Sequence, residues 1–176
     1  MTEISRVEFL LRALKSFSIF EKPEIQDIHI DDFLVRFIAL VRNDLYQSGI
    51  EISKIVDSNV TSVRADPRLL HQVLLNLITN ASDALEDQMN KKINVRVMKQ
   101  DDLVAIIVED NGCGMSKEAQ ANLFKPFYTT KTRGTGLGLM ITLKMVTLMK
   151  GNMEIKSTKD KGTSVTIVIP EGARNA

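Results

Sequence analysis

The segment from Asp66 to Asp87 constrains the fold more than any other part of the sequence, because it carries two stripes of side chains at helical spacing. Asp66 is a favourable helix N-cap and Pro67 suits the first helical position, so a helix should begin here and run to about Asp87. One stripe is apolar: Leu70, Leu74, Leu77, Ala81 and Leu85. The neighbouring stripe is polar: Gln72, Asn76, Asn80, Asp83 and Asp87. Such a helix packs on one face, and its other face is either solvated or holds a ligand.

The remaining periodic segments indicate a mixture of helices and strands. Helical spacing predicts helices at 4–20, 30–46 and 137–149, whereas alternation predicts strands at 50–55, 93–98, 103–109, 153–157 and 164–169. The polar segment 99–102 suits an antiparallel hairpin between the second and third strands. Helices and strands do not alternate strictly, as they would in a doubly wound sheet. We therefore expect an α+β two-layer sandwich, with a mixed but mostly antiparallel sheet covered by helices on one face.

Composition excludes several classes of partner and site. The chain has 176 residues, which suits one domain with at most a short extension. Its 23 basic residues balance 22 acidic residues, so no charge pattern favours nucleic acid or an anionic membrane. Cys113 is the only cysteine, which excludes an intrachain disulfide and a cysteine-clustered metal site. No secretion signal is visible, and we expect a cytoplasmic location with no membrane contact by this chain.

Asn76 and Asn80 stand one helical turn apart on the polar stripe of the Asp66 helix. An amide oxygen can coordinate Mg²⁺ without adding the charge of a carboxylate, and such cations are often shared with the phosphates of a substrate. Asparagines at this spacing therefore suit a metal site next to a phosphate, although they also suit a solvated face.

A second motif, Asp110-Asn111-Gly112-Cys113-Gly114, follows the expected strand 103–109. An ionised aspartate can accept a hydrogen bond from the exocyclic N–H of adenine, and Gly112 and Gly114 let the backbone approach a base. The same pattern is also compatible with a simple tight turn. Taken alone, the motif leaves both interpretations open.

A third motif, Gly134-Thr135-Gly136-Leu137-Gly138, opens the expected helix 137–149. Backbone amides and the positive end of a helix can together hold a phosphate. The spacing matches neither the dinucleotide-binding fingerprint nor the P-loop signature. Residues 123–131, between the second and third motifs, are apolar at their start and polar at their end, and could close over a nucleotide.

Together and in this order, the motifs resemble the catalytic domain of histidine kinases in the GHKL superfamily, over about residues 30–170. Residues 74–81 resemble the N box, 110–114 and 134–138 the two glycine boxes, and 124–127 the F box. Gly162-Thr163 resembles the family's late Gly-Thr, whose threonine lies near adenine. The short lid is similar to that of the nitrogen-regulatory kinases.

The resemblance implies that the chain binds Mg-ATP for transfer of its terminal phosphoryl group in two-component signalling. It implies metal ligation by Asn76 and Asn80, and catalytic roles for Asn76 and Lys131. The nucleotide contacts that it implies are Asn76, Asn80, Asp83, Asp110, Gly112, Gly114, Phe127, Thr130, Lys131, Gly134, Thr135, Gly136, Leu137, Gly138 and Thr163. In the superfamily's ATPases, a glutamate four residues before the metal-binding asparagine activates water. Asn76 stands at that position here, and its amide has no useful basicity at neutral pH.

The chain departs from a complete histidine kinase in lacking a recognisable acceptor histidine. His29 and His71 are its only histidines, and neither is followed by an acceptor motif. Residues 1–22 resemble the end of a dimerisation helix, and residues 23–176 the catalytic domain. The implied partners are a dimerisation domain that bears the histidine and, indirectly, a response regulator. Three alternatives remain open: a module that senses nucleotide without transferring phosphate, a GHKL ATPase clamp, and a serine-directed kinase of the anti-sigma type.

Overall fold

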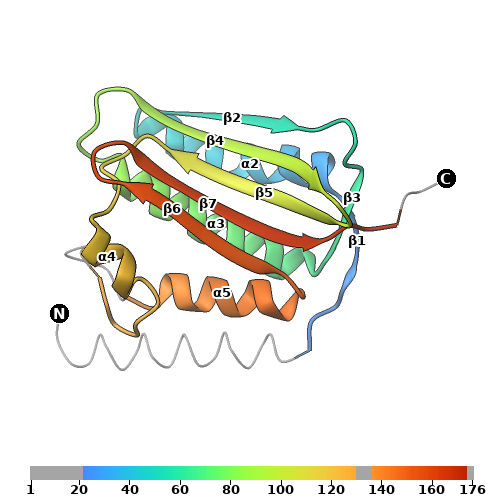
Figure 1. Cartoon of the computed structure of the whole chain (residues 1–176). Coiled ribbons are helices and arrows are strands. Elements are labelled where there is room, and N and C mark those ends of the chain that lie inside the picture. The colour runs from blue at the N-terminus through green and yellow to red at the C-terminus, as the bar shows by residue number, and fades with distance from the viewer. Residues whose placement is uncertain (1–21, 130–135, 174–176) are drawn as a thin grey trace.

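The computed structural model describes residues 22–129 and 136–173 (Figure 1). The expected helix at 4–20 lies outside the described residues. The elements in chain order are β1 (Gln26–His29), α2 (Ile30–Gln47), β2 (Ile50–Val56), β3 (Ser62–Ala65), α3 (Pro67–Ala84), β4 (Lys91–Gln100), β5 (Leu103–Asp110), α4 (Lys117–Asn122), α5 (Gly138–Leu148), β6 (Asn152–Thr158) and β7 (Gly162–Pro170).

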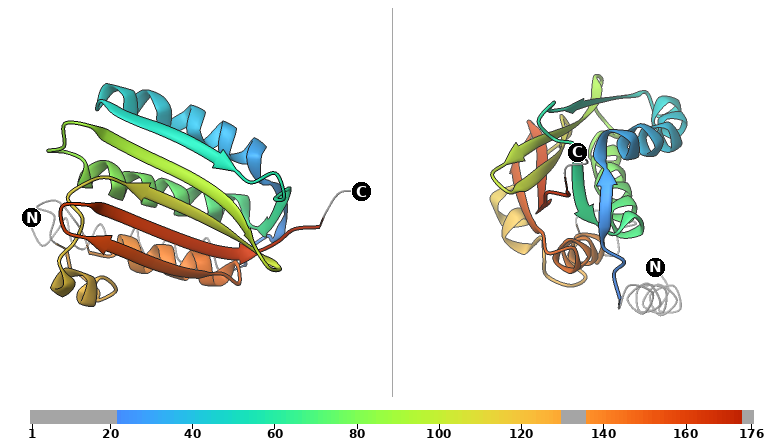
Figure 2. Two further views of the ribbon diagram at one scale, coloured as in Figure 1. Left: turned by 45° about the horizontal axis from the view of Figure 1, so that its top comes forward. Right: turned by 90° about the vertical axis from the view of Figure 1, so that its right-hand side faces the viewer.

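The main sheet has five strands in the order β2-β4-β5-β7-β6. Strands β2 and β4 pair in parallel, and the other three pairings are antiparallel. Helices α2, α3 and α5 lie together against one face of this sheet, and none of the described helices covers the opposite face, here called the open face (Figure 2). The predicted fold class, an α+β sandwich with a mostly antiparallel mixed sheet covered on one face, is therefore confirmed.

Three short elements were not predicted from the sequence. Strands β1 and β3 form a separate two-stranded sheet, and α4 makes less than two turns. Four-residue strands contain too few side chains to display alternation, and tertiary contact decides their conformation. Helix α3 also ends at Ala84, short of the predicted Asp87. In the described residues, no helix is long and apolar enough to cross a membrane.

The core lies between the helices and the inner face of the sheet. All five apolar side chains predicted on the α3 stripe are buried: Leu70, Leu74, Leu77, Ala81 and Leu85. Across from them, alternate side chains of β5 point inward, and Val104, Ile106 and Val108 are buried. Alternation of this kind gives β5 one face in the core and places its last inward position, Asp110, at the edge of the helical layer.

The N-terminus of α3 is fixed by a buried aspartate. The Asp66 carboxylate is fully buried and accepts hydrogen bonds from the backbone N–H groups of Arg68 at 2.9 Å and Glu24 at 2.8 Å. The Arg68 guanidinium also donates to it at 2.7 Å. Burial alone would raise the pKa of this carboxyl, but the hydrogen bonds and the charge of Arg68 lower it to about 2. Asp66 therefore caps α3 as predicted and also joins it to the chain that precedes β1.

Candidate nucleotide-binding site

One end of the candidate site is the place where β5 ends beside the start of β7. Asp110, the last residue of β5, is paired across the two strands with Thr163 of β7. Both lie at inward positions of the sheet. They also line a cavity of about 530 Å³ at this end of the sheet, whose other walls include Asn94, Glu109 and Lys156 of the open face. The N–H of Gly112 donates to Asp110 Oδ1 at 2.8 Å, which fixes the carboxylate at the mouth of the loop. Two predicted adenine-binding residues are thus brought together.

The loop that follows Asp110 is held by close backbone contacts. A Cβ on Gly112 would overlap the Ala84 carbonyl at the end of α3, and one on Gly114 would overlap the Thr158 carbonyl at the end of β6. Between them, the N–H of Cys113 donates to the Ala84 carbonyl at 3.0 Å. The predicted glycines are therefore required here by the packing of the polypeptide itself, before any base is considered.

A chain of hydroxyl and amide hydrogen bonds supports Thr163. The Ser157 hydroxyl, on β6, donates to the Gly162 carbonyl at 3.0 Å and lies 2.9 Å from Thr163 Oγ1. Because the Ser157 proton is committed to Gly162, the Thr163 hydroxyl is the donor in the second contact. Gln120 of α4 ties the same strand to the loop by donating to the carbonyls of Ser157 and Met115. The Thr163 hydroxyl oxygen consequently keeps the capacity to accept a further hydrogen bond.

The other end of the candidate site lies between α3 and α5. Asn76 donates through Nδ2 to Thr142 Oγ1 at 3.1 Å, and its Oδ1 accepts from Gln72 Nε2 at 2.9 Å. Thr142 is fully buried and donates its hydroxyl proton to the Gly138 carbonyl at 2.9 Å. The predicted metal ligand is thus connected by two hydrogen bonds to the glycine at which α5 begins.

The donor set on α3 suits a cation that is shared with a phosphate. Asn76 and Asn80 are both partly exposed, and Asp83 is exposed on the same side of the helix. Among the residues that the structure describes, no group of three or more His, Cys, Asp or Glu side chains could hold a metal ion. Mg²⁺ binds well to a few side-chain oxygens supplemented by water and substrate phosphates, so these residues fit that metal.

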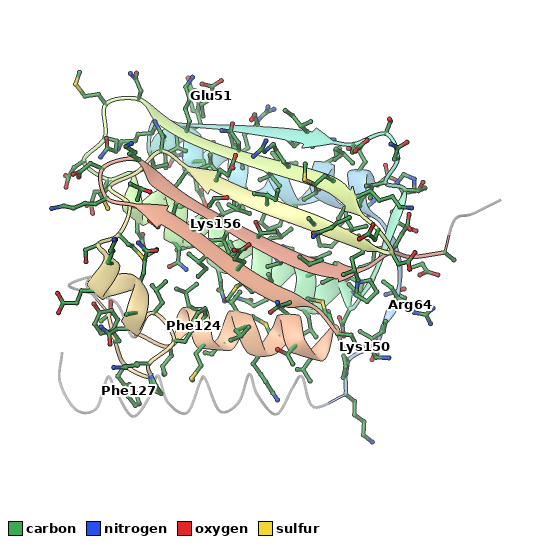
Figure 3. The ribbon with its side chains drawn as sticks, in the orientation of Figure 1. Glu51, Arg64, Phe124, Phe127, Lys150 and Lys156 are labelled. Atoms are coloured by element: carbon green, nitrogen blue, oxygen red, sulfur yellow. The ribbon has the colours of Figure 1, made fainter. Side chains whose placement is uncertain are left out.

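The segment between α4 and α5 contains the predicted lid, and its two ends meet. A Cβ on Gly136 would overlap the backbone of Phe127, which itself has a positive φ of 65°. Figure 3 shows Phe124 and Phe127 in this region, and their side chains are 42% and 49% exposed. The close approach of the Gly136 and Phe127 backbones brings the two described ends of this segment together. Leu137 follows and is buried. Four predicted residues lie outside the described residues: Thr130, Lys131, Gly134 and Thr135.

The two histidines lie away from these groups. His71 is half a turn of α3 out of phase with Asn80, and its ring packs edge-on against Phe37 of α2 at 5.3 Å. His29 precedes α2, and its Nδ1 lies 3.4 Å from the Asp32 carboxylate at an exposed position. Neither contact involves the residues of the candidate site, and the prediction that neither histidine is a phosphate acceptor stays a prediction.

Three residues that touch this site were not singled out from the sequence: Gln120, Thr142 and Ser157. The sequence does mark Thr142, since it is a polar residue four positions after Gly138, and the other buried residues of α5, Met145 and Val146, are apolar. No sequence pattern marks Ser157 or Gln120, because a serine on a strand and a glutamine on a short helix are common at solvated positions.

Comparison with known proteins agrees with this geometry. Residues 65–173 match the family model described as histidine kinase-, DNA gyrase B- and HSP90-like ATPase. The chain is 30% identical over 171 residues to the signal transduction histidine-protein kinase AtoS of Escherichia coli K12, covering 97% of this chain and 28% of that protein.

Solved structures give the same result. Full-length ShkA in complex with AMPPNP superposes with a TM-score of 0.77 and 26% identity, covering 88% of this chain and 33% of that one. The catalytic domain of the histidine kinase ThkA superposes with a TM-score of 0.75 and 27% identity, covering 85% and 97% respectively. The chain therefore belongs to the histidine kinase-, DNA gyrase B- and HSP90-like ATPase family, as an ATP-binding catalytic domain of the histidine kinase type.

Proposed function

We propose that this domain binds Mg-ATP and transfers the γ-phosphoryl group to a histidine on a separate dimerisation domain. The chain spans 28% of the length of AtoS, so the activity of a whole signalling protein is inferred from this part. The observation that carries the proposal is that one helix, α3, joins two polar groups: the loop after Asp110 is hydrogen-bonded to Ala84 at its end, and Asn76 lies about two turns earlier. Asp110 and Thr163 form one group, and Asn76 with the start of α5 forms the other.

The assignment of roles follows from the chemistry of each end. The acceptor oxygens of Asp110 and Thr163 suit the exocyclic amino group of adenine. Asn76 and Asn80 suit Mg²⁺ bound between the phosphates, and the amides at the start of α5 suit the phosphates themselves. We extend this to Lys131, Thr130, Gly134 and Thr135, which the family resemblance assigns to the lid over the terminal phosphate. When bound, Mg²⁺ would neutralise charge that develops on the transferring group.

Transfer to a protein acceptor is favoured over hydrolysis because no base stands at the water-activating position. Asn76 occupies that position, and its amide hydrogen-bonds Gln72 and Thr142. An amide cannot accept a proton from water at neutral pH. Catalysis would rest on positioning and charge neutralisation, which supply most of the rate in phosphoryl transfer.

The proposed acceptor belongs to another domain, because His71 packs against Phe37 and His29 lies beside Asp32. A response regulator would then receive the phosphoryl group from that histidine. Since ATP and such relays operate in the cytoplasm, we place this domain there. Residues 1–22 would be the end of the dimerisation helix that joins the two domains.

The test incubates the chain with γ-labelled ATP and Mg²⁺, alone and with a cognate dimerisation domain. We expect acid-labile, base-stable label on the added domain at a rate that rises with its concentration, and no label on this chain. Label on this chain alone would show that His29 or His71 is an acceptor after all. Nucleotide binding without label on any acceptor would favour the nucleotide-sensing alternative.

A further inference from the structure

Thr142 stands apart from the other polar side chains of the candidate site because it is fully buried. It lies on the face of α5 that meets α3, and its hydroxyl makes two hydrogen bonds. It donates to the Gly138 carbonyl at 2.9 Å, one helical turn earlier, and it accepts from Asn76 Nδ2 at 3.1 Å. None of the motifs that identify this domain requires a hydroxyl at this position.

The direction of these two hydrogen bonds is fixed by proton counting. A threonine hydroxyl has one proton, and here the Gly138 carbonyl, which cannot donate, takes it. Towards Asn76 the Thr142 oxygen can therefore act only as an acceptor. The group of Asn76 that faces it must be the NH₂, because an amide oxygen in that place would meet a second acceptor.

Gln72 reinforces the same orientation from the other side. Its Nε2 donates to Asn76 Oδ1 at 2.9 Å, one turn earlier on α3. A carbonyl oxygen has two lone pairs, so this hydrogen bond leaves one for a metal ion. Only the oxygen of an amide ligates Mg²⁺, because the nitrogen lone pair is delocalised into the carbonyl. An Asn76 amide turned by half a rotation would present N–H groups to the cation.

We propose that Thr142 is a positioning residue that orients the Asn76 amide for Mg²⁺ and couples that orientation to the start of α5. This inference rests on the proposed function, since it presumes that Asn76 ligates the metal. It goes beyond it by assigning a role to a side chain that touches neither nucleotide nor metal. Because the Thr142 proton is held by Gly138, a shift of the glycine-rich start of α5 on nucleotide binding would reach the metal ligand directly.

The test replaces Thr142 by Val, which keeps the shape of the side chain and removes the hydroxyl, and by Ser, which restores it. Removing the hydroxyl leaves the Gly138 carbonyl with its ordinary helical partner, so α5 should remain intact. Thr142→Ala is a second variant without the hydroxyl, in case valine disturbs the packing. Thr147→Val is the matched control, because Thr147 makes the same hydrogen bond to a residue one turn earlier, at 2.8 Å, on the exposed side of α5.

The measurement is AMPPNP affinity over a series of Mg²⁺ concentrations, with adenosine affinity in the presence of a chelator as a second reading. We expect Thr142→Val and Thr142→Ala to raise the Mg²⁺ concentration for half-maximal binding by about tenfold, the effect of roughly one hydrogen bond. Thr142→Ser and Thr147→Val should stay within about twofold of the unsubstituted chain on the same scale. Adenosine affinity should be the same in all variants, since it needs no metal.

The outcomes separate this inference from the proposed function. An equal Mg²⁺ midpoint in Thr142→Val and Thr147→Val would overturn the inference and leave the proposed function standing. A parallel loss of AMPPNP and adenosine affinity in Thr142→Val would overturn it too, since it would show a merely structural role. If the unsubstituted chain bound AMPPNP without any dependence on Mg²⁺, the proposed metal site would fail and the inference with it.

Discussion

The two ends of the candidate site are built in different ways. The Asp110 end is held by close contacts between backbone segments. Three glycines each lie against the backbone of another element, in the pairs Gly112 with Ala84, Gly114 with Thr158, and Gly162 with Asp110. The Asn76 end is held by hydrogen bonds between side chains, those of Gln72, Asn76 and Thr142. Backbone contacts of this kind cannot relax without moving a strand, whereas side chains can change rotamer. We infer that the base end is preformed and that the metal end is adjustable.

The largest expected effect comes from a substitution that breaks the backbone end. Gly162 has a φ of 104°, and a Cβ there would overlap the Asp110 carbonyl. Gly162→Ala should therefore lower the free energy of unfolding by about 3 kcal/mol or more, as measured by urea denaturation. Gly49→Ala is the control, because Gly49 has a φ of 70° with no atom within 4 Å of the added Cβ, so only the backbone strain of about 1 kcal/mol remains. Equal losses in the two variants would refute close packing as the cause.

A smaller effect on the free energy of unfolding should appear at the N-terminus of α3, the helix that contacts both ends of the candidate site. The pKa of Asp66 is lowered from 3.8 to about 2, so its carboxylate stabilises the fold fully above pH 4. That contribution is lost as the pH falls from about 4 to about 2. Asp66→Asn keeps a helix cap but removes the charge, and should cost roughly 2 kcal/mol at pH 7. Urea denaturation at pH 7 and near pH 2 checks this, since the difference between the two proteins should shrink in acid. A difference that does not change with pH would contradict the assignment.

A substitution at Gly138 tests whether a glycine at the adjustable end is needed for stability or for nucleotide binding. A Cβ on Gly138 meets no atom within 4 Å, so Gly138→Ala should leave the free energy of unfolding unchanged or slightly raised. The same Cβ would stand at the helix start where phosphates approach the amides, so AMPPNP affinity should fall by about tenfold. Isothermal titration calorimetry with AMPPNP and with adenosine separates the two effects. Loss of adenosine affinity, or unchanged AMPPNP affinity, would show that the phosphates lie elsewhere.

The same contrast explains how much of the molecule the sequence predicts. The apolar stripe of α3 and the long strands follow from periodicity, and these predictions are confirmed. The close packing of Gly112 and Gly114 agrees with the need for glycine there, whereas their contacts with a nucleotide stay a prediction. Strands β1 and β3 depend on contacts between segments far apart in the chain, which local patterns do not encode. The hydrogen bond of Asn76 to Thr142 joins residues of two helices, so a residue-type pattern can propose each member but not the pair.

The smallest expected effect concerns the choice of base, and it tests whether the preformed end also contains a tunable contact. The Ser157 hydroxyl donates its proton to the Gly162 carbonyl, so the Thr163 hydroxyl must donate its own proton to Ser157. Towards a base, the Thr163 oxygen can then act only as an acceptor. Adenine offers a donor at its exocyclic amine, whereas guanine offers a carbonyl at the same ring position, so an acceptor-only Thr163 disfavours guanine.

In Ser157→Ala the Thr163 hydroxyl can turn and donate, so part of that discrimination is lost. We expect the ratio of adenosine to guanosine affinity to fall by roughly threefold, which is below 1 kcal/mol, in a competition assay. Ser62→Ala is the matched control, because Ser62 also lies on a strand and its hydroxyl also donates to a backbone carbonyl, that of Ala173 at 2.8 Å, but in the separate β1–β3 sheet. A ratio that falls equally in both variants, or in neither, would mean that Asp110 alone reads the base and that nothing at this end is tunable.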